Sequence, residues 1–177
     1  EKKKGIDKMI SMQKHKLYLQ LKDFNKATKC LEVLSNSFPN DLEVLQILAE
    51  AYLLTNDKEK AILVFKSISE KDPKNGQVHL TLANFYRDNG DLDKSFSELK
   101  LAFRSDKISI ETKLAILSSY LPIINANDTI KNQAFELAEI LKRSDFNNSG
   151  IYAVFGDLYY ATGNKTLAKK NYKKSLS

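Results

Sequence analysis

Apolar residues recur at helical spacing along most of the chain, and residues 42–75 show the pattern most clearly. Apolar side chains stand three or four positions apart twice, first at Leu45, Leu48 and Tyr52, then at Ala61 and Phe65. This spacing places the apolar side chains of each half on one helix face. The pattern therefore predicts two short amphipathic helices in succession.

A turn separates these two helices, and a proline closes the unit. Thr55-Asn56-Asp57 interrupts the apolar spacing, and Asn and Asp favour turns because their side chains bond nearby backbone groups. Asp57 is placed to cap the second helix. Pro73 ends the unit because proline cannot continue a helix. Residues 42–75 are thus predicted to fold as helix, turn and helix.

The unit returns with a constant period. Tyr18, Tyr52 and Tyr86 are 34 residues apart (52 − 18 = 34 and 86 − 52 = 34), and Asp57 has Asp23 and Asp91 as counterparts. One helix pair cannot bury both of its apolar faces, so copies must stack on one another. The predicted repeats span residues 8–41, 42–75, 76–109, 110–148 and 149–177.

The repeated unit resembles the tetratricopeptide repeat, whose signature is W-x2-L-G-x2-Y, then A-x3-F, then P. Residues 48–73 match it at Leu48-Ala49, Tyr52, Ala61, Phe65 and Pro73, with Leu45 in place of the tryptophan. Residues 82–91 and 155–172 match it again. The resemblance implies an all-α fold, in which about five antiparallel helix pairs form one right-handed superhelical solenoid over residues 1–177. The chain is expected to be a fragment of a longer protein.

Repeat one departs from the signature at one position. His15 stands where the family places a small residue, which normally allows the two helices of a pair to approach closely. Looser packing of this first pair is therefore expected.

Repeat four is irregular. Helices are predicted at residues 112–120 and 129–143, with about five extra residues between them. Leu117 stands at the small-residue position, and Pro122 is expected to stop the first helix. Ile123 and Ile124 have two readings: they pack on neighbouring helices, or they contact a partner.

The last helix is predicted at residues 166–176. Leu167, Ala168, Tyr172 and Leu176 would leave an apolar edge at the end of the solenoid, where a polar capping helix is usual. The chain either continues beyond this helix or uses the edge for contact. Self-assembly through the exposed terminal helices is accordingly the alternative function.

Charge is concentrated at the two ends. The net charge is +6: residues 1–40 carry nine lysines and four acids, and residues 149–177 carry five lysines and one acid. Arginine occurs only at positions 87, 104 and 143. Because lysine greatly outnumbers arginine, bidentate recognition of phosphates or bases is disfavoured. A nucleic-acid partner is therefore not expected. Binding of the basic ends to an anionic surface stays open and would depend strongly on salt.

Signals for chemistry are missing. His15 and His79 have no Asp, Glu or Cys at metal-ligand spacing, and Cys30 lies inside a predicted helix as a packing residue. No nucleophile elbow, phosphate loop or HExxH sequence occurs. No apolar run is long enough to span a bilayer, and no signal peptide is seen. We predict no catalytic residue, metal or cofactor, and we assign the repeated tyrosines to the core.

The resemblance also implies where a partner would bind. In this family the concave groove is formed by the first helices of successive repeats. The groove offsets correspond here to Gln46, Glu50, Leu53, Gln77, Leu80, Asn84, Arg87 and Asp157. The expected function is a non-enzymatic scaffold that binds a peptide or partner protein in this groove. The Lys and Asn clamp for chaperone tails is absent.

The expected source organism and cellular compartment of this protein are suggested only by its composition and its resemblance to known proteins. The chain is rich in Lys, Asn and Ile and poor in Arg, and it resembles the long tetratricopeptide repeat proteins of Bacteroidetes. That resemblance favours the bacterial cell envelope or periplasm over the cytoplasm.

Overall fold

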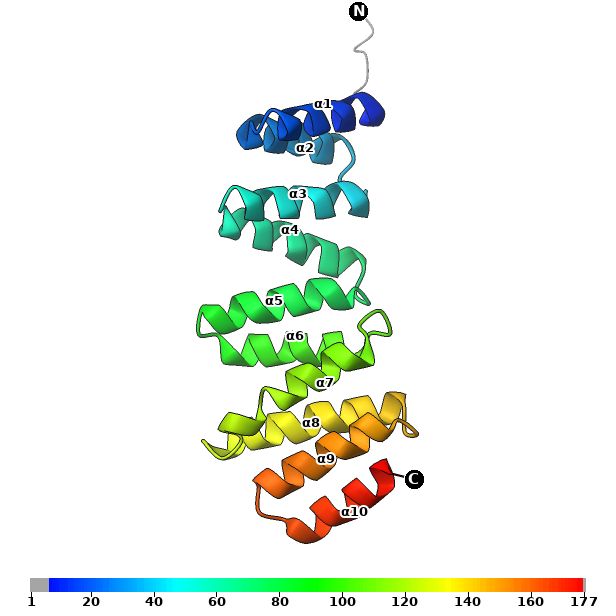
Figure 1. Cartoon of the computed structure of the whole chain (residues 1–177). Coiled ribbons are helices and arrows are strands. Elements are labelled where there is room, and N and C mark those ends of the chain that lie inside the picture. The colour runs from blue at the N-terminus through cyan, green and yellow to red at the C-terminus, as the bar shows by residue number, and fades with distance from the viewer. Residues whose placement is uncertain (1–6, 177) are drawn as a thin grey trace, which may run out of the picture. The chain divides into compact units, whose positions relative to one another are not determined.

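The computed structural model describes residues 7–176, and all regular elements within this range are helical (Figure 1). It divides into two compact units, unit 1 (Glu1–Pro73) and unit 2 (Lys74–Ser177). Unit 1 holds α1 (Lys8–Gln20), α2 (Phe24–Ser37), α3 (Leu42–Leu54) and α4 (Lys58–Lys71). Unit 2 holds α5 (Gly76–Asp88), α6 (Leu92–Arg104), α7 (Ile110–Ser118), the 3-10 turn η1 (Leu121–Ile123), α8 (Asp128–Ser144), α9 (Ser149–Ala161) and α10 (Lys165–Ser175). The all-helical prediction is confirmed.

The α-helices of the described residues begin in a common way. An Asp, Asn or Ser side chain at each N-cap accepts a hydrogen bond from a backbone N–H two or three residues further on. Such caps satisfy donors that have no partner within the helix. Asp57 caps α4, as the sequence predicts, by accepting from the N–H of Lys60.

The turn inside each of the first three repeats carries a further device. In repeat two the Lys60 ammonium lies 2.8 Å from the Asp57 carboxylate and 5.3 Å from the centre of the Tyr52 ring. Repeats one and three repeat the arrangement with Tyr18, Asp23 and Lys26, and with Tyr86, Asp91 and Lys94. In each of these three repeats, one ion pair and one cation–π contact therefore stabilise the turn between the two helices.

Unit 1 is held by small residues at the crossing of its helix pairs. Ala49 and Ala61 are both fully buried where α3 crosses α4. In the first pair His15 replaces the small residue, yet it is buried, and its Nδ1 lies 3.1 Å from the carbonyl oxygen of Ala27. The imidazole therefore fills the crossing and bonds across it, and the looser packing of this pair stays a prediction.

Unit 2 ends in a tightly packed pair, α9 and α10. A Cβ on Gly156 would come within 2.4 Å of the Tyr172 ring, so glycine is the residue that allows this approach. Ala168 is buried in the same contact, while Leu167 and Tyr172 are half-buried. The predicted apolar edge is therefore exposed at Leu176 and only partly exposed at Leu167 and Tyr172. The ring of Tyr172 packs between α9 and α10.

Repeat four deviates from its neighbours. Helix α7 has nine residues and ends at Ser118, two residues earlier than predicted, and α8 is one residue longer at each end. Pro122 lies in η1, so it does not itself stop α7. Helix α8 packs against α6 and α9, and α7 contacts α8 and α9 only lightly. Leu117 and Ile124 are fully buried in the core of unit 2, together with Leu137.

The repeated tyrosines lie in or against the core. Tyr52 is buried, and Tyr18, Tyr86, Tyr120 and Tyr159 are half-buried. Tyr120 and Tyr159 pack against the core of unit 2. Their assignment to packing rather than to a ligand ladder is confirmed for these positions.

Candidate functional site

An apolar cleft opens in unit 2 between the α5–α6 pair and the segment from α7 to α8. Its volume is about 580 Å³. Helix α5 contributes Leu80, α6 contributes Phe96 and Leu99, α7 contributes Ile116, and η1 contributes Ile123. With Ile130 of α8, apolar side chains thus line it from five consecutive elements of this unit. Concave, mainly apolar pockets with a few polar groups are the usual form of binding sites.

The cleft exists because α7 is held away from α6 at its far end. Near its start, the buried ammonium of Lys113 donates to the carbonyl oxygen of Ser105, 2.7 Å away, and ties α7 to the end of α6. Burial lowers the pKa of Lys113. After η1, the side chain of Asn125 donates to the carbonyl oxygen of Ala161 at 2.9 Å, which ties this segment to α9. Helix α7 therefore runs obliquely between two anchors (Figure 1).

The two isoleucines of the inserted segment have different environments. Ile124 is fully buried in the core, whereas Ile123 is 49% exposed and lines the cleft. Of the two readings left open by the sequence, packing holds for Ile124. Partner contact remains possible for Ile123 alone.

The cleft is nearly uncharged. Among its described lining residues, Arg87 is the one with a formal charge, and Arg87 lies 3.4 Å from the exposed carboxylate of Asp88. Burial raises the pKa of Tyr120, and the nearby Arg87 opposes that rise, so the phenol stays neutral at ordinary pH. Polar groups are placed at the cleft by Asn84 and Gln133. Any preference of this cleft for a charged ligand would therefore be a preference for an anion, set by the Arg87 guanidinium.

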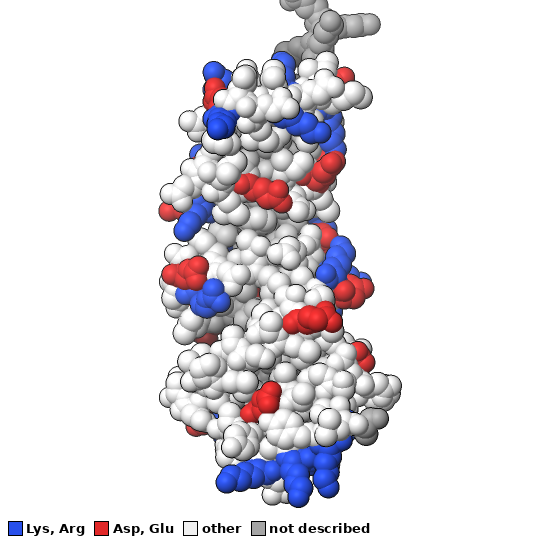
Figure 2. Space-filling view, viewed as in Figure 1, with Lys and Arg blue, Asp and Glu red and all other residues white. Residues whose placement is uncertain are grey.

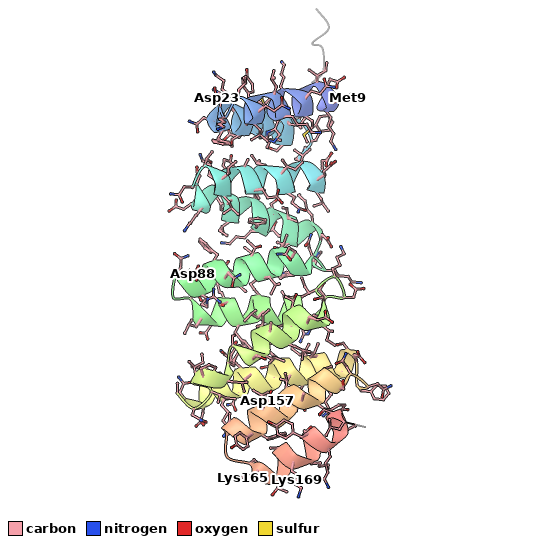
Figure 3. The ribbon with its side chains drawn as sticks, viewed as in Figure 1. Met9, Asp23, Asp88, Asp157, Lys165 and Lys169 are labelled. Carbon is pink, nitrogen blue, oxygen red and sulfur yellow. The ribbon has the colours of Figure 1, made fainter. Side chains whose placement is uncertain are left out.

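The structure brings together some of the groove residues predicted for unit 2. Leu80, Asn84 and Arg87 line the cleft, while the exposed Gln77 does not. Asp157 lies on α9 and accepts a hydrogen bond from the Tyr172 hydroxyl at 2.7 Å (Figure 3). Burial, followed by this hydrogen bond, raises the pKa of Tyr172 to about 12. Asp157 thus stabilises the α9–α10 pair.

The groove residues predicted for unit 1 form a surface of their own on α3. The Gln46 amide donates to the Glu50 carboxylate at 3.2 Å, one helical turn along. Leu53 follows on the same helix and is 43% exposed. These three side chains are exposed to solvent.

The apolar lining residues Phe96, Leu99 and Ile116 were not among those predicted from the sequence, which considered partner contact for Ile123 in this segment. The family's groove offsets lie on first helices, so residues of α6 were not considered. A signal was available in the extra residues of repeat four, which place two isoleucines next to a proline.

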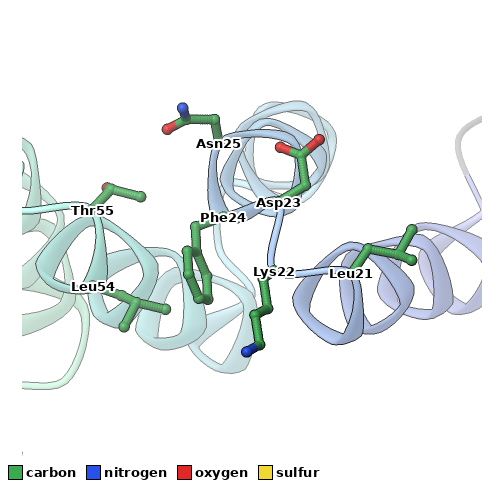
Figure 4. Close-up of a pocket in the computed structure, with 7 residues that line it drawn as sticks. All are labelled: Leu21, Lys22, Asp23, Phe24, Asn25, Leu54 and Thr55. Carbon is green, nitrogen blue, oxygen red and sulfur yellow. The ribbon is translucent and has the colours of Figure 1, made fainter.

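A second hollow in unit 1 is formed at repeat turns. It is lined by residues 21–25 and by Leu54 and Thr55, with a volume of about 440 Å³. Figure 4 shows the Phe24 ring beside Leu54, with Lys22 on its other side. Phe24 is 40% exposed and Leu54 is 59% exposed. Since the α1–α2 turn and the end of α3 form its walls, it is a gap between neighbouring repeats.

The residues with potential for chemistry are dispersed. His15 is bonded within the α1–α2 pair, and Nδ1 of His79 lies 2.6 Å from the Glu98 carboxylate within the α5–α6 pair. Cys30 is half-buried on α2. Across residues 7–176, His, Cys, Asp and Glu nowhere gather in a group of three able to hold a metal ion. Over the same range, no helix combines the length and apolar character needed to cross a membrane.

The comparisons with known proteins identify the repeat. Residues 43–75 and residues 149–177 each match a model of the tetratricopeptide repeat family. The chain therefore contains tetratricopeptide repeats. The two matched segments correspond to predicted repeats two (residues 42–75) and five (residues 149–177).

A curated relative carries the same repeat. The tetratricopeptide repeat-containing protein YpiA of Bacillus subtilis (strain 168) is 31% identical over 93 residues. The match covers 52% of this chain and 21% of YpiA, so the chain spans about a fifth of that relative's length. The resemblance to Bacteroidetes proteins stays a prediction.

Solved structures support the fold. A crystal structure of MamA protein has a TM-score of 0.58 and 18% identity, covering 95% of this chain and 89% of MamA. Another MamA crystal structure has a TM-score of 0.56 and 18% identity, with 92% of both chains covered. The helical repeat solenoid of the tetratricopeptide family is thus confirmed.

Proposed function

We propose that this tetratricopeptide repeat protein is a non-enzymatic scaffold and that the cleft between α5 and α8 holds an amphipathic segment of a partner protein. The observation that carries the proposal is the exposed apolar lining, above all Ile123, which is 49% exposed on a short turn. Apolar side chains left in water favour association, because covering one fully is worth about 1.5–3 kcal/mol. A partner's apolar residues would supply that cover.

The polar residues of the cleft fit a peptide ligand. Asn84 offers both a donor and an acceptor to a peptide backbone, and Arg87 offers a guanidinium for an acidic side chain. The preferred segment thus has apolar residues on one face and an acidic residue at the end next to Arg87. Helical segments recognised in grooves have this pattern, with apolar anchors three and four positions apart.

The rest of the predicted groove remains a prediction. Gln46, Glu50 and Leu53 on α3, with Gln77 on α5 and Asp157 on α9, are proposed as secondary contacts only. Asp157 is the weakest of these because Tyr172 already occupies its carboxylate.

Selection from a displayed peptide library tests the proposal. Wild-type protein is the target, and an Ile123→Glu variant is used to remove peptides that bind elsewhere. We expect enriched sequences with apolar residues at helical spacing and an acidic residue. Their affinity should fall about tenfold or more for the variant, since a charge then lies in the apolar wall.

A matched control separates this effect from a general one. Leu101 is an exposed residue of α6 that does not line the cleft, so Leu101→Glu adds the same charge at another site of unit 2. The selected peptides should bind this control as they bind the wild type. If no sequence is enriched, or if both variants bind equally, the cleft is not the binding site.

Self-assembly through the terminal helices remains the alternative prediction. The outer face of α10 carries several lysines, and like charges on two copies of this face would repel each other. Sedimentation at two concentrations distinguishes the alternatives, since a concentration-independent monomer would exclude assembly.

A further inference from the structure

Helix α10 is the most basic element of unit 2. It carries Lys165, Lys169, Lys170, Lys173 and Lys174, and it has no acidic residue between Lys165 and Ser175. Figure 2 shows lysine side chains gathered at this end of the unit, and Figure 3 shows Lys165 and Lys169 on α10. Five ammonium groups on one short helix attract anions.

A comparison with the other second helices shows that this charge replaces an apolar surface. The residue after the small crossing residue is Thr28 in α2, Ile62 in α4, Phe96 in α6 and Phe135 in α8, and each is buried or half-buried. In α10 the same position is Lys169, which is exposed. The outer face of α10 is therefore hydrated and positively charged.

The lysines extend to a cleft between α8, α9 and α10, with a volume of about 290 Å³. Tyr152, Phe155 and Tyr159 line this cleft, as do Lys170 of α10 and Lys142 of α8. Aromatic faces are thus combined with ammonium groups from two opposing helices. This cleft shares no lining residue with the one between α5 and α8.

Aromatic rings help to hold the lysines in place. The Lys174 ammonium lies 4.2 Å from the centre of the Tyr152 ring, and the Lys142 ammonium lies 5.0 Å from that of Phe155. Cation–π attraction restricts such side chains and keeps their charge at the cleft. Glu139, 3.4 Å from Lys142, is the one carboxylate among the described lining residues. The positive charge of the cleft therefore exceeds the negative charge.

Spacing indicates which anion fits. Lys170 and Lys174 are one helical turn apart, which corresponds to about 6 Å along the helix axis. Side chains on one side of an extended peptide repeat at about 6.6 Å. Carboxylates at alternate positions of an extended segment would therefore meet both lysines, while the aromatic residues contact its backbone and intervening side chains.

We propose that the cleft between α8, α9 and α10 binds an extended acidic segment of a partner protein, with alternate carboxylates on Lys170 and Lys174 and Lys142 on the opposite wall. The charged groups are lysines, whose compact ammonium pairs well with single carboxylates and lacks the fork that reads phosphates. This site is independent of the proposed function of the cleft between α5 and α8.

Fluorescence anisotropy tests the proposal with the whole chain. The probe is a short labelled peptide in which glutamate and threonine alternate, and the comparison peptide has the same composition with all glutamates in one block. We expect the alternating peptide to bind about tenfold more tightly than the block peptide. Its affinity should fall as salt rises, because exposed charges are screened.

Charge-reversal variants locate the site. Lys170→Glu with Lys174→Glu should weaken binding of the alternating peptide by at least about tenfold. The control reverses two exposed lysines of α1, Lys14→Glu with Lys16→Glu, which changes the net charge equally and should leave the affinity unchanged. Circular dichroism verifies that both variants keep their helices.

Three results would overturn the inference. Equal weakening in both variants would mean that net charge alone attracts the peptide. Equal affinity for the two peptides would remove the argument from spacing. Binding to vesicles rich in phosphatidylglycerol, or to a single-stranded oligonucleotide, without binding to the alternating peptide would assign the lysines to another anion. Peptides selected on the cleft between α5 and α8 report on that cleft separately, since Ile123→Glu leaves α10 unchanged.

Discussion

Repeats two and four show what the crossing point of a helix pair controls. In repeat two, Ala49 and Ala61 occupy the small-residue positions of the two helices, and both are fully buried. In repeat four the corresponding residues are Leu117 and Ala134, which are equally buried. Helices with small residues at their contact approach more closely than helices separated by a leucine. Leu117, the larger residue, is therefore found in the α7–α8 pair, which packs less closely than the α3–α4 pair.

The difference has a consequence for function. Helices α3 and α4 pack along their length, whereas α8 packs mainly on α6 and α9 and leaves α7 oblique. The apolar cleft lies beside α7, in the repeat that departs from the family pattern. Regular repeats supply a rigid frame here, and the irregular one supplies the exposed apolar surface.

Leu117→Ala should produce the largest effect. Its side chain is fully buried in the core of unit 2, so truncation leaves a cavity and lowers the free energy of unfolding by about 2–5 kcal/mol. Chemical denaturation monitored by circular dichroism measures the loss. A loss comparable to that of a surface substitution, such as Leu63→Ala on α4, would mean that α7 closes onto α8 when the leucine is removed.

Ala49→Leu places the residue of repeat four into repeat two. Ala49 and Ala61 are both fully buried, so a leucine at position 49 should force α3 and α4 to shift or distort, at a cost of about 1–3 kcal/mol. The same denaturation experiment applies. Ala51→Leu is the matched control because Ala51 retains 7% exposure, and we expect a smaller loss. Equal losses would show that the crossing point has no special role.

The smallest expected effect concerns pH. The side-chain bond with Lys60, aided by the backbone N–H of the same residue, lowers the pKa of Asp57. Asp23 and Asp91 have lowered pKa values for the same reason. A lowered pKa contributes stability above the unfolded value of about 4, and that stability is lost as pH falls through the folded pKa. Repeats four and five are capped by Asn127 and Asn164, which do not titrate.

Asp57→Asn tests this difference. Asparagine keeps the cap but removes the titration, so the unfolding free energy of the variant should fall less than that of the wild type as pH drops from about 5 to about 2. Asn164→Asp should do the reverse in repeat five. Parallel pH profiles for the wild type and both variants would contradict the assignment.

Much of the fold could be predicted from sequence because the repeat combines local signals. Caps such as Asp57 and small residues such as Ala61 each act within one helix pair, so their spacing suffices. Helix bounds were least accurate in repeat four, where tertiary anchors decide them. Lys113 and Asn125 bond to backbone groups at the ends of α6 and α9, and no local pattern predicts such bonds.

The candidate site was predicted less completely for the same reason. Leu80, Asn84 and Arg87 follow from the family's offsets and do line the cleft. Phe96 and Ile123 line it because α7 is oblique, which depends on packing between elements far apart in the sequence. The lysines of α10 were counted as charge, but their relation to the aromatic rings of α9 appears only in the structure.

The extra residues of repeat four lie inside a helix pair, between α7 and α8, rather than between pairs. Of the two isoleucines in the inserted segment, Ile124 is fully buried in the core, whereas Ile123 is 49% exposed. Residues such as Ile123 can therefore change in size or polarity at little cost to folding. Binding preference and structural stability are encoded by different residues in this repeat, which makes the segment a natural place for recognition to diversify.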